Sequence, residues 1–270
     1  MTKNVFQFRQ FSVRHMASAM KVGTDGVLLG ALATIEAPQR ILDVGTGCGL
    51  IALILAQRTQ SGEHSLQEDS PHAPARNEMS QTACVLVHAV EVDRPSANEA
   101  RDNFALSPWA DRLQIFPQRL QGFAATSSTD YDLIVCNPPF YDGSLPINPG
   151  RASARHVTSL TASDLLGAAN QLLSDSGVLS VIVPYTRLAA YTAAAEAAEL
   201  FLRRDVTIFP LPRRTPKRIV LEFAREPGPI RHERLVIQVA QHEFTADYRR
   251  LTSPFYLEQT FRRSKSSSTE

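Results

Sequence analysis

The stretch "RILDVGTGCGL" (40–50) joins an apolar run to a helical one through three glycines. The run 40–45 ends on Asp-Val-Gly, and "LIALILAQR" (50–58) carries apolar residues at helical spacing. A strand, a glycine-rich turn and a helix in that order begin a βαβ unit. Glycine accepts positive φ, and the free N–H groups of the helix start point into such a turn. The turn is therefore predicted to hold a ligand.

The spacing of the glycines limits the kind of ligand. They occupy alternate positions, Gly45, Gly47 and Gly49. A dinucleotide fingerprint, GxGxxG, requires glycine at position 50, where this chain has Leu50. Asp43, two residues before the first glycine, disfavours a diphosphate and favours a cationic amino-acid group. Alternatively, the side chain of Asp43 caps the turn by accepting a hydrogen bond from a nearby backbone N–H group.

A second acid, Glu91, follows the next apolar run, "ACVLVHAVEVD" (83–93). A carboxylate at the end of this strand can accept hydrogen bonds from both hydroxyls of a ribose. The alternative is an ordinary charge at a strand end. Taken with the turn, the acid predicts that a nucleoside-type ligand binds at Asp43, Gly45, Gly47, Gly49 and Glu91.

Working outward, strand-like and helix-like runs alternate along the chain. Strands are expected at 40–45, 83–93, 112–117, 131–139, 177–184, 206–210 and 217–224, and helices at 50–58, 94–106, 161–173 and 187–202. This order predicts an α/β fold of Rossmann type, with a seven-stranded, mostly parallel sheet and helices on both faces. Residues 1–257 are expected to form one domain, with a flexible surface insertion at 60–82 and a disordered tail at 258–270.

Composition excludes several classes of protein. No apolar run in the 270 residues approaches the roughly 20 residues needed to span a bilayer. The three cysteines match neither a disulfide framework nor a metal motif, and the seven histidines lack ligand spacing, so we expect a cytoplasmic protein without a metal. Net charge is +1, yet residues 201–270 hold 14 Lys and Arg against 8 Asp and Glu. This basic third suits a polyanionic partner, or is a solvated surface.

Three motifs, "LDVGTGCG" (42–49), "AVEVD" (89–93) and "VCNPPF" (135–140), resemble those of class I methyltransferases that use S-adenosylmethionine. Further stretches, "FSVRHMASAMKVGTDGVLLGA" (11–31), "SPWADRL" (107–113) and "FYL" (255–257), are similar to the bacterial tRNA(Val) adenine-N6 methyltransferases. The resemblance covers nearly the whole chain. It implies that S-adenosylmethionine is the cofactor, that tRNA is the partner, and that N6 of adenine-37, next to the anticodon of tRNA(Val), is methylated.

The "VCNPPF" motif fits this chemistry residue by residue. An exocyclic amine conjugated to a ring is a poor nucleophile, and acceptors for its N–H groups favour the pyramidal transition state and its positive charge. Asn137 offers a side-chain carbonyl, and Pro138 a backbone carbonyl fixed by its ring. Pro139 stiffens the next residue, and Phe140 provides a face for the extruded base. The alternative is a strand end with a capped turn.

Other candidate residues come from the resemblance or from local charge. Lys21, Thr24 and Asp25 are expected to form a lid over the cofactor within an N-terminal lid segment, 1–35, although Thr24 or Asp25 also suits the N-cap of the following helix. Gln118 is a candidate acceptor for the cofactor's adenine amine, which the neighbouring Arg119, a donor only, cannot be. The candidate RNA contacts lie in two basic stretches: Arg151, Arg155, His156, Arg213, Arg214, Lys217 and Arg218. Solvated arginines are the alternative there.

Two other functions remain open from the sequence. One is methyl transfer to a different planar nitrogen, either a protein glutamine amide or a base of ribosomal RNA or DNA. The other is a catalytically silent RNA-binding module, which the intact glycine turn and "NPPF" disfavour. We expect the protein to be a monomer.

Overall fold

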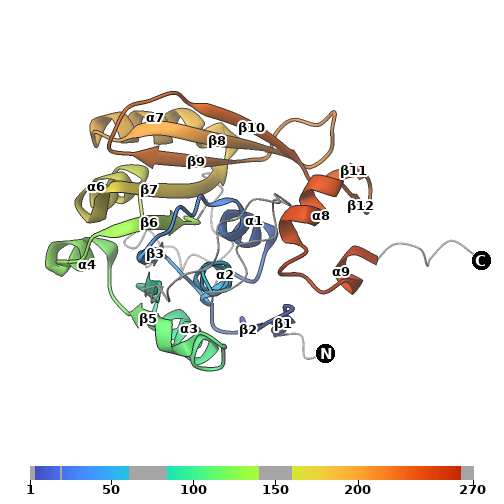
Figure 1. Cartoon of the computed structure of the whole chain (residues 1–270), viewed down its shortest axis with the longest axis horizontal. Helices are drawn as coiled ribbons and strands as arrows, with labels where there is room; N and C mark the ends of the chain where they lie inside the picture. Colours follow the sequence, from blue (N-terminus) through green and yellow to red (C-terminus); the bar gives the residue numbers. More distant parts are fainter. Residues whose placement is uncertain (1–3, 19, 61–83, 140–159, 263–270) are drawn as a thin grey trace, which may run out of the picture.

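A single eight-stranded sheet with helices on both faces dominates the computed structural model (Figure 1), which describes residues 4–18, 20–60, 84–139 and 160–262. From edge to edge the strands are β10 (Arg231–Val236), β8 (Phe201–Phe209), β9 (Arg218–Ala224), β7 (Leu173–Pro184), β6 (Tyr131–Cys136), β3 (Arg40–Val44), β4 (Leu86–Val90) and β5 (Leu113–Phe116). Only β9 runs antiparallel to its neighbours, β7 and β8. The predicted α/β class is confirmed, with eight strands where seven were expected.

Alternating side chains of the strands feed two apolar layers. Ile41 of β3 packs on one face and Leu42 on the other, as the two-residue period of a strand requires. The first layer contains α1 (Thr24–Leu32), α2 (Leu50–Arg58), α3 (Arg94–Ala105) and α8 (Ala246–Thr252). The second contains α4 (Leu120–Thr126), α6 (Ala162–Leu172) and α7 (Leu188–Ala197). Figure 1 shows the sheet between these two sets of helices.

Helix α1 lies directly against α2, and a glycine sets their separation. A Cβ atom on Gly30 would lie 2.7 Å from Cγ2 of Ile54, so only glycine allows this approach. Residues Gly26–Ala31 of α1 are all buried, which explains why this helix is apolar on every side. The start of α1 is thereby fixed beside the glycine-rich turn that precedes α2.

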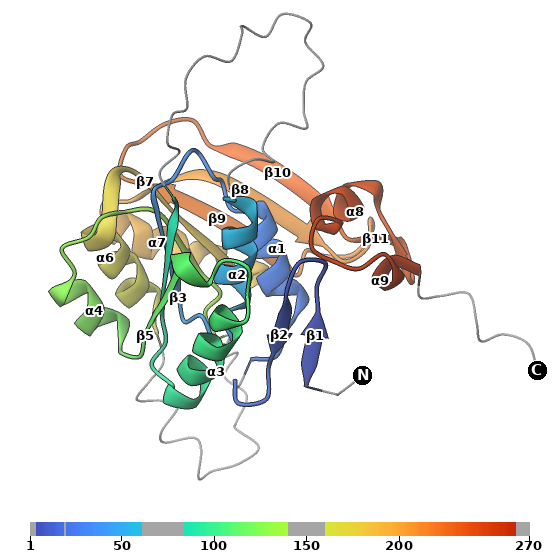
Figure 2. The ribbon, with the colours of Figure 1, turned by 60° about the horizontal axis from the view of Figure 1, so that its bottom comes forward.

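The two ends of the described chain pack together. The hairpin of β1 (Val5–Gln7) and β2 (Ser12–Arg14) lies near the closing unit of β11 (Gln238–Ala240), β12 (Glu243–Phe244), α8 and α9 (Gln259–Arg262) (Figure 2). The backbone N–H of Arg9 donates to the carbonyl of Phe255 at 2.8 Å, and the Phe6 ring meets Tyr256 edge-on. Two short 3₁₀ turns, η1 (Ala110–Arg112) and η2 (Tyr185–Arg187), complete the described elements.

Some predicted boundaries are wrong. The helix expected over 187–202 ends at Ala197, and β8 begins at Phe201 instead of residue 206. The cause is Glu199, whose φ of 55° is left-handed and turns the chain back, so that the Leu200 N–H donates to the Ala195 carbonyl. The segment expected as a tail begins with α9. Most of the predicted insertion, 61–82, lies outside the described residues.

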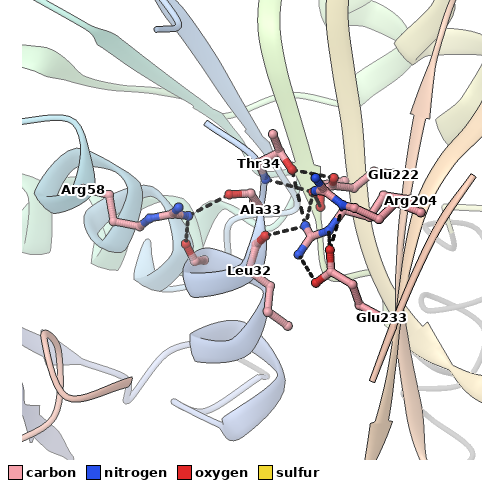
Figure 3. Close-up of polar contacts among 10 residues, drawn as sticks. Leu32, Ala33, Thr34, Arg58, Arg204, Glu222 and Glu233 are labelled. Carbon is pink, nitrogen blue, oxygen red and sulfur yellow. Dashed lines mark hydrogen bonds and ion pairs between the residues drawn. The ribbon is translucent and has the colours of Figure 1, made fainter. Parts of the chain in front are cut away.

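A buried network of charges holds the C-terminal end of α1 (Figure 3). Arg58 donates to the carbonyls of Gly30 and Ala33 at 2.7 and 2.8 Å, and Arg204 donates to that of Leu32 at 2.8 Å. These carbonyls have no partner inside the helix, so the guanidinium groups supply it. Arg204 also pairs with Glu222 and Glu233.

Thr34, just beyond α1, completes the network. Its N–H and hydroxyl donate to the Glu222 carboxylate at 2.8 and 2.7 Å. The helix is thus anchored at one end to β8 and β9, while its other end stays beside the glycine-rich turn.

Candidate functional site

The site lies where neighbouring parallel strands end. Val44 of β3 is in register with Val90 of β4 and with Cys136 of β6, and Val90 is in register with Phe116 of β5. The order of strands reverses around β3, since β4 lies on one side and β6 on the other. Ligands of open α/β sheets bind at such a switch point, beyond the carboxyl ends of the strands. The glycine turn, Glu91 and Asn137 all follow these ends.

A cavity of about 210 Å³ opens at this edge. Of the predicted residues, its wall includes Gly45, Gly47, Glu91, Gln118, Asn137, Pro138 and Pro139. Ser18, Met20, Asp93, Ser96 and Leu160 also line it. We call this the nucleoside cavity. The sequence therefore brings three motifs, from different parts of the chain, into one wall.

A second cavity, of about 300 Å³, adjoins it and is called the lid cavity below. Lys21, Thr24, Asp25 and Gly26 come from the start of α1 and the segment before it, and Thr46, Cys48 and Ile51 come from the turn and α2. Both cavities share Met20, Gly45, Gly47 and Asn137. They are two parts of one elongated site, which bends around these four residues.

Asp43 lies beneath the turn and does not contribute to the described wall of either cavity. Its side chain is fully buried, and Oδ2 accepts hydrogen bonds from the Thr46 hydroxyl at 2.6 Å and the Ala52 N–H at 3.1 Å. Burial raises the pKa of Asp43 to about 7, and its Oδ1 has no hydrogen-bond partner in the part of the chain that the structure describes. The aspartate fixes the turn against the start of α2, so the capping alternative describes its contacts.

The glycines of the turn have two different roles. Gly45, Gly47 and Gly49 all have positive φ, as the sequence predicted. Gly45 and Gly47 line the cavities, whereas Gly49 does not appear in the described wall. A Cβ atom on Gly49 would lie 2.5 Å from the ring of Phe104, so this glycine allows α2 and α3 to pack closely.

Glu91 connects the turn to the next strand. Its Oε2 accepts from the Gly47 N–H at 2.9 Å and its Oε1 from the Asp93 N–H at 2.8 Å. The side chain is 8% exposed, and burial raises its pKa. Glu91 lines the nucleoside cavity, and a carboxylate can accept several hydrogen bonds, which suits a diol. Asp93 is the N-cap of α3, and its side chain accepts from the Ser96 N–H.

Asn137 presents an acceptor without a partner. Its Nδ2 donates to the sulfur of Met20 at 3.2 Å, while its Oδ1 is buried and has no hydrogen-bond partner within the described protein. A buried amide oxygen without a donor costs free energy, on the order of 1–3 kcal/mol. Because Asn137 lines both cavities, a ligand donor in the site would relieve this cost.

The segment that carries Ser18 and Met20 is held by a residue that sequence reasoning missed. Glu99, on α3 and 9% exposed, accepts hydrogen bonds from the N–H groups of Met16, Ala17 and Ser18. A glutamate in the middle of a polar helix reads as surface charge, so the sequence contains no signal for this contact. Glu99 therefore sets the position of one wall of the nucleoside cavity.

The expected lid residues lie at the lid cavity, with one correction. Lys21 donates to the carbonyl of His15 at 2.7 Å. The N-cap of α1 is Gly23, so the expectation that Thr24 or Asp25 caps this helix is wrong. Asp25 instead pairs with Arg218 at 2.7 Å. Arg218, predicted to meet RNA, thus pairs with a residue in the wall of the lid cavity.

The remaining predicted residues divide into three groups. Gln118 lines the nucleoside cavity beside Arg119. Arg213, Arg214 and Lys217 are exposed on the β8–β9 loop. Four predicted residues lie outside the described residues: Phe140, Arg151, Arg155 and His156.

The described residues contain no group of three or more His, Cys, Asp or Glu arranged to hold a metal ion. Within the same residues, no helix is long and apolar enough to cross a membrane. Burial raises the pKa of the Cys48 thiol to about 12, which fits a packed residue and not a nucleophile.

Solved structures resemble this fold. A predicted O-methyltransferase from Agrobacterium tumefaciens superposes with a TM-score of 0.61, covering 86% of this chain and 96% of that chain at 18% identity. A 16S rRNA N2 G1207 methyltransferase from T. thermophilus, in complex with AdoMet and guanosine, gives a TM-score of 0.51 over 82% of this chain and 50% of that chain, at 18% identity. At these identities the likeness shows the class I methyltransferase fold.

Sequence comparison is more specific, although no protein-family model matches the chain. The tRNA1(Val) (adenine(37)-N6)-methyltransferase of Trichodesmium erythraeum is 39% identical over 94% of this chain and 98% of its own length. The proteins of the same name from Flavobacterium johnsoniae and Cronobacter sakazakii are 40% and 37% identical, each over 94% of this chain and at least 96% of their own length. Since these matches span both chains almost completely, the chain belongs to the tRNA1(Val) (adenine(37)-N6)-methyltransferase family.

Proposed function

We propose that this protein methylates N6 of adenine-37 of tRNA(Val), with S-adenosylmethionine as the methyl donor. The observation that carries the proposal is Asn137 Oδ1, which has no hydrogen-bond partner among the described residues and lies in the wall shared by two cavities. A catalytically silent module has no need to bury an amide oxygen without a donor. The family relationship supports the choice of acceptor.

The residues present fit the cofactor. It carries a ribose, an adenine and a cationic amino acid, and the bent site offers a partner for each part. Glu91 would hold the ribose hydroxyls, and Gln118 is the candidate acceptor for the adenine amine. Gly45, Gly47 and the lid residues Lys21 and Thr24 would surround the amino-acid part. When bound, the cofactor supplies an electrophilic methyl group on a sulfonium centre.

The chain's own part in the reaction is to orient the acceptor amine. Asn137 Oδ1 would accept one N–H of the adenine amine, and the carbonyl of Pro138 would accept the other. Both acceptors favour the pyramidal nitrogen and the positive charge that develops as the new bond forms. Such positioning supplies most of the rate. Once methylated, the nitrogen carries a positive charge and is acidic, so it releases its extra proton to water.

The RNA approaches through basic segments. Arg213, Arg214 and Lys217 are exposed on the β8–β9 loop, in the most basic third of the chain. Contacts of this kind bind phosphate and hold an RNA in register without reading its sequence. The family relationship, and not this charge, specifies tRNA(Val). We expect the enzyme to act as a monomer, which sedimentation of the free protein and its RNA complex would check.

The acceptor is tested with labelled S-adenosylmethionine and four substrates: unmodified tRNA(Val), ribosomal RNA, duplex DNA and a glutamine-containing peptide. Mass spectrometry of the products should give N6-methyladenosine in the tRNA alone, at position 37. Label in another acceptor would reject the tRNA assignment and retain methyl transfer. Label in none of them, with cofactor bound, would favour a silent module.

The role of the amide is tested by Asn137→Ala, with the exposed Asn98→Ala as a matched control. Loss of one preorganised polar contact to the transition state should reduce kcat by roughly 100- to 1000-fold. Cofactor affinity, measured by calorimetry, should change by only a few-fold, because other residues supply most of the wall. Transfer at the parent rate in Asn137→Ala would remove this amide from the mechanism.

A further inference from the structure

A third cavity, of about 490 Å³, adjoins the lid cavity, between the hairpin at the start of the chain and the closing unit at its end, and shares no lining residue with the nucleoside cavity. Its wall comprises Phe6, Val22, Gly23, Thr24, Pro210, Ile237, Gln238, Phe244, Tyr248, Tyr256, Thr260 and Phe261. We call it the aromatic pocket. Figure 2 shows how β1, α8, α9 and β11 gather around this part of the molecule. None of the residues assigned to methyl transfer explains it.

Aromatic rings form most of its apolar wall. Phe244 stacks on Tyr248 with ring centroids 5.0 Å apart, and Phe261 meets Phe244 and Tyr256 edge-to-face at 5.8 and 6.0 Å. Phe6 and Phe261 are only half-buried. The edge-to-face contacts of Phe261 leave its ring outside the Phe244–Tyr248 stack. Half-buried rings of this kind are platforms on which a planar ligand can stack.

The pocket also contains polar groups. Gln238 adds an amide and Thr260 a hydroxyl, and Tyr248 and Tyr256 each carry a phenol hydroxyl. An aromatic wall with a few polar side chains suits a ligand that is flat, apolar on its faces and polar at its edge. A nucleobase has this character. A lipid chain does not need the amide, and a free phosphate does not need the rings.

Basic side chains lie on the loop and the helix next to the pocket. Pro210, in its wall, begins the β8–β9 loop with Arg213, Arg214 and Lys217, and the guanidinium of Arg249 lies 5.9 Å from the centre of the Phe261 ring. Arg234 on β10 stacks on Phe209 and donates to the carbonyl of Pro212, which supports the same loop. An occupant with an attached phosphate backbone would meet complementary charge.

The aromatic pocket is next to the reaction site. Gly23 and Thr24 line both this pocket and the lid cavity, so one short segment separates them. An RNA whose target adenine is turned out of its stack exposes the neighbouring bases as well. A second site is needed to hold one of them. The pocket offers it within reach of the same loop.

We propose that the aromatic pocket binds a second base of the substrate RNA, one that flanks the methylated adenine, by stacking it on Phe261 or its neighbours. The proposal rests on the proposed function, since it assumes that RNA is the substrate. It assigns the C-terminal unit a role in substrate recognition. RNA affinity should therefore depend on a nucleobase that is not itself modified.

The experiment combines protein and RNA variants in a double-mutant cycle. The proteins are the parent, Phe261→Ala, Phe261→Leu and the control Phe201→Ala, whose ring is 43% exposed at the start of β8, outside the pocket wall. The RNAs are the anticodon stem–loop and two copies, each with one abasic nucleotide, on the 5′ or 3′ side of the target adenine. Binding is measured by fluorescence anisotropy, and thermal melting checks that each variant is folded.

The proposal expects one abasic RNA to bind the parent roughly tenfold more weakly than the intact RNA. Phe261→Ala should weaken binding of the intact RNA by a similar factor. This variant should bind the abasic RNA as well as the intact RNA, because the protein change and the RNA change remove the same contact. Phe261→Leu should fall between, and Phe201→Ala should match the parent. The inference would be overturned if the protein change and the RNA change weakened binding independently, so that their factors multiplied. It would also be overturned if a folded Phe261→Ala bound the intact RNA as tightly as the parent does.

Failure of the proposed function is a separate outcome. If the parent binds RNA in the expected pattern yet methylates no tRNA, the pocket assignment stands and the activity is wrong. If the parent methylates tRNA(Val) and neither abasic RNA is weakened, the activity stands and the pocket has another occupant, such as a protein segment.

Discussion

Replacing Glu99 by alanine should open one wall of the nucleoside cavity while the rest of the fold persists. The carboxylate accepts three backbone N–H groups in succession, from Met16, Ala17 and Ser18. Hydrogen bonds to a charged acceptor each contribute about 1.5–3 kcal/mol. The loop would regain part of this from water once it opens. Asn103 would still hold it, because its side chain bonds to both the N–H and the carbonyl of Arg14.

We therefore expect the free energy of cofactor binding to become less favourable by about 2–3 kcal/mol, which raises the dissociation constant roughly 30- to 150-fold. Titration calorimetry with S-adenosylmethionine measures it directly. Glu99→Gln keeps one acceptor oxygen and should fall between the parent and Glu99→Ala. Asp102→Ala, an exposed acid on the same helix, is the matched control and should bind as the parent does. A folded Glu99→Ala that binds within threefold of the parent would refute the argument.

Three further predictions follow from charges at other positions. Burial raises the pKa of Asp43 from 3.8 to about 7, so between these pH values the folded state retains a proton that the unfolded state loses. The free energy of unfolding should therefore fall as pH rises from 3.8 to about 7. Thermal melts from pH 4 to pH 8 should show this slope in the parent protein and a flatter one in Asp43→Asn. Glu222→Ala removes the buried carboxylate that accepts from Thr34 and pairs with Arg204, and should lower the free energy of unfolding by about 3–5 kcal/mol. Calorimetry should then show a Tm lower by roughly 6–15 °C. The control, Glu226→Ala, changes an exposed residue and should alter Tm little. Replacing Arg213, Arg214 and Lys217 together by alanine should reduce the slope of log affinity against log salt by about 2–3 in RNA titrations, and leave cofactor binding unchanged; an unchanged slope would move the phosphate contacts elsewhere.

The centre of the fold could be predicted because its signals are local. An apolar run followed by glycines with positive φ and then an apolar helix has one common structural solution, and β3, the turn and α2 lie within one residue of their expected bounds. Glu91 and Asn137 were found for the same reason, since each directly follows a strand. Because parallel strands end at the same edge of a sheet, no further sequence signal is needed to predict that these residues lie together.

The missed features depend on partners far away in the chain. The strand β10 has the sequence RHERLV, which reads as a charged loop, yet its charges pair across to β8: Glu233 with Arg204 and His232 with Asp205. Charged side chains are common on edge strands, where they discourage further pairing. Glu199 adopts a left-handed conformation that local sequence assigns to glycine, so the end of α7 had no signal. Glu99 and Met20 gain their roles only when β2, α3 and β6 are assembled.

The anchor of α1 also sets the order in which a growing chain can complete its parts. Thr34 waits for Glu222, 188 residues later, and Arg9 waits for the carbonyl of Ser253, 244 residues later. When only the first half of the chain has been synthesised, β3, the glycine turn and α2 are complete, but the end of α1 is held by Arg58 without Arg204 and Glu222, which come later. Contacts this distant in sequence form last. Helix α1 therefore precedes by 188 residues the acceptor that anchors it, so a chain that stops before Glu222 leaves this anchor incomplete.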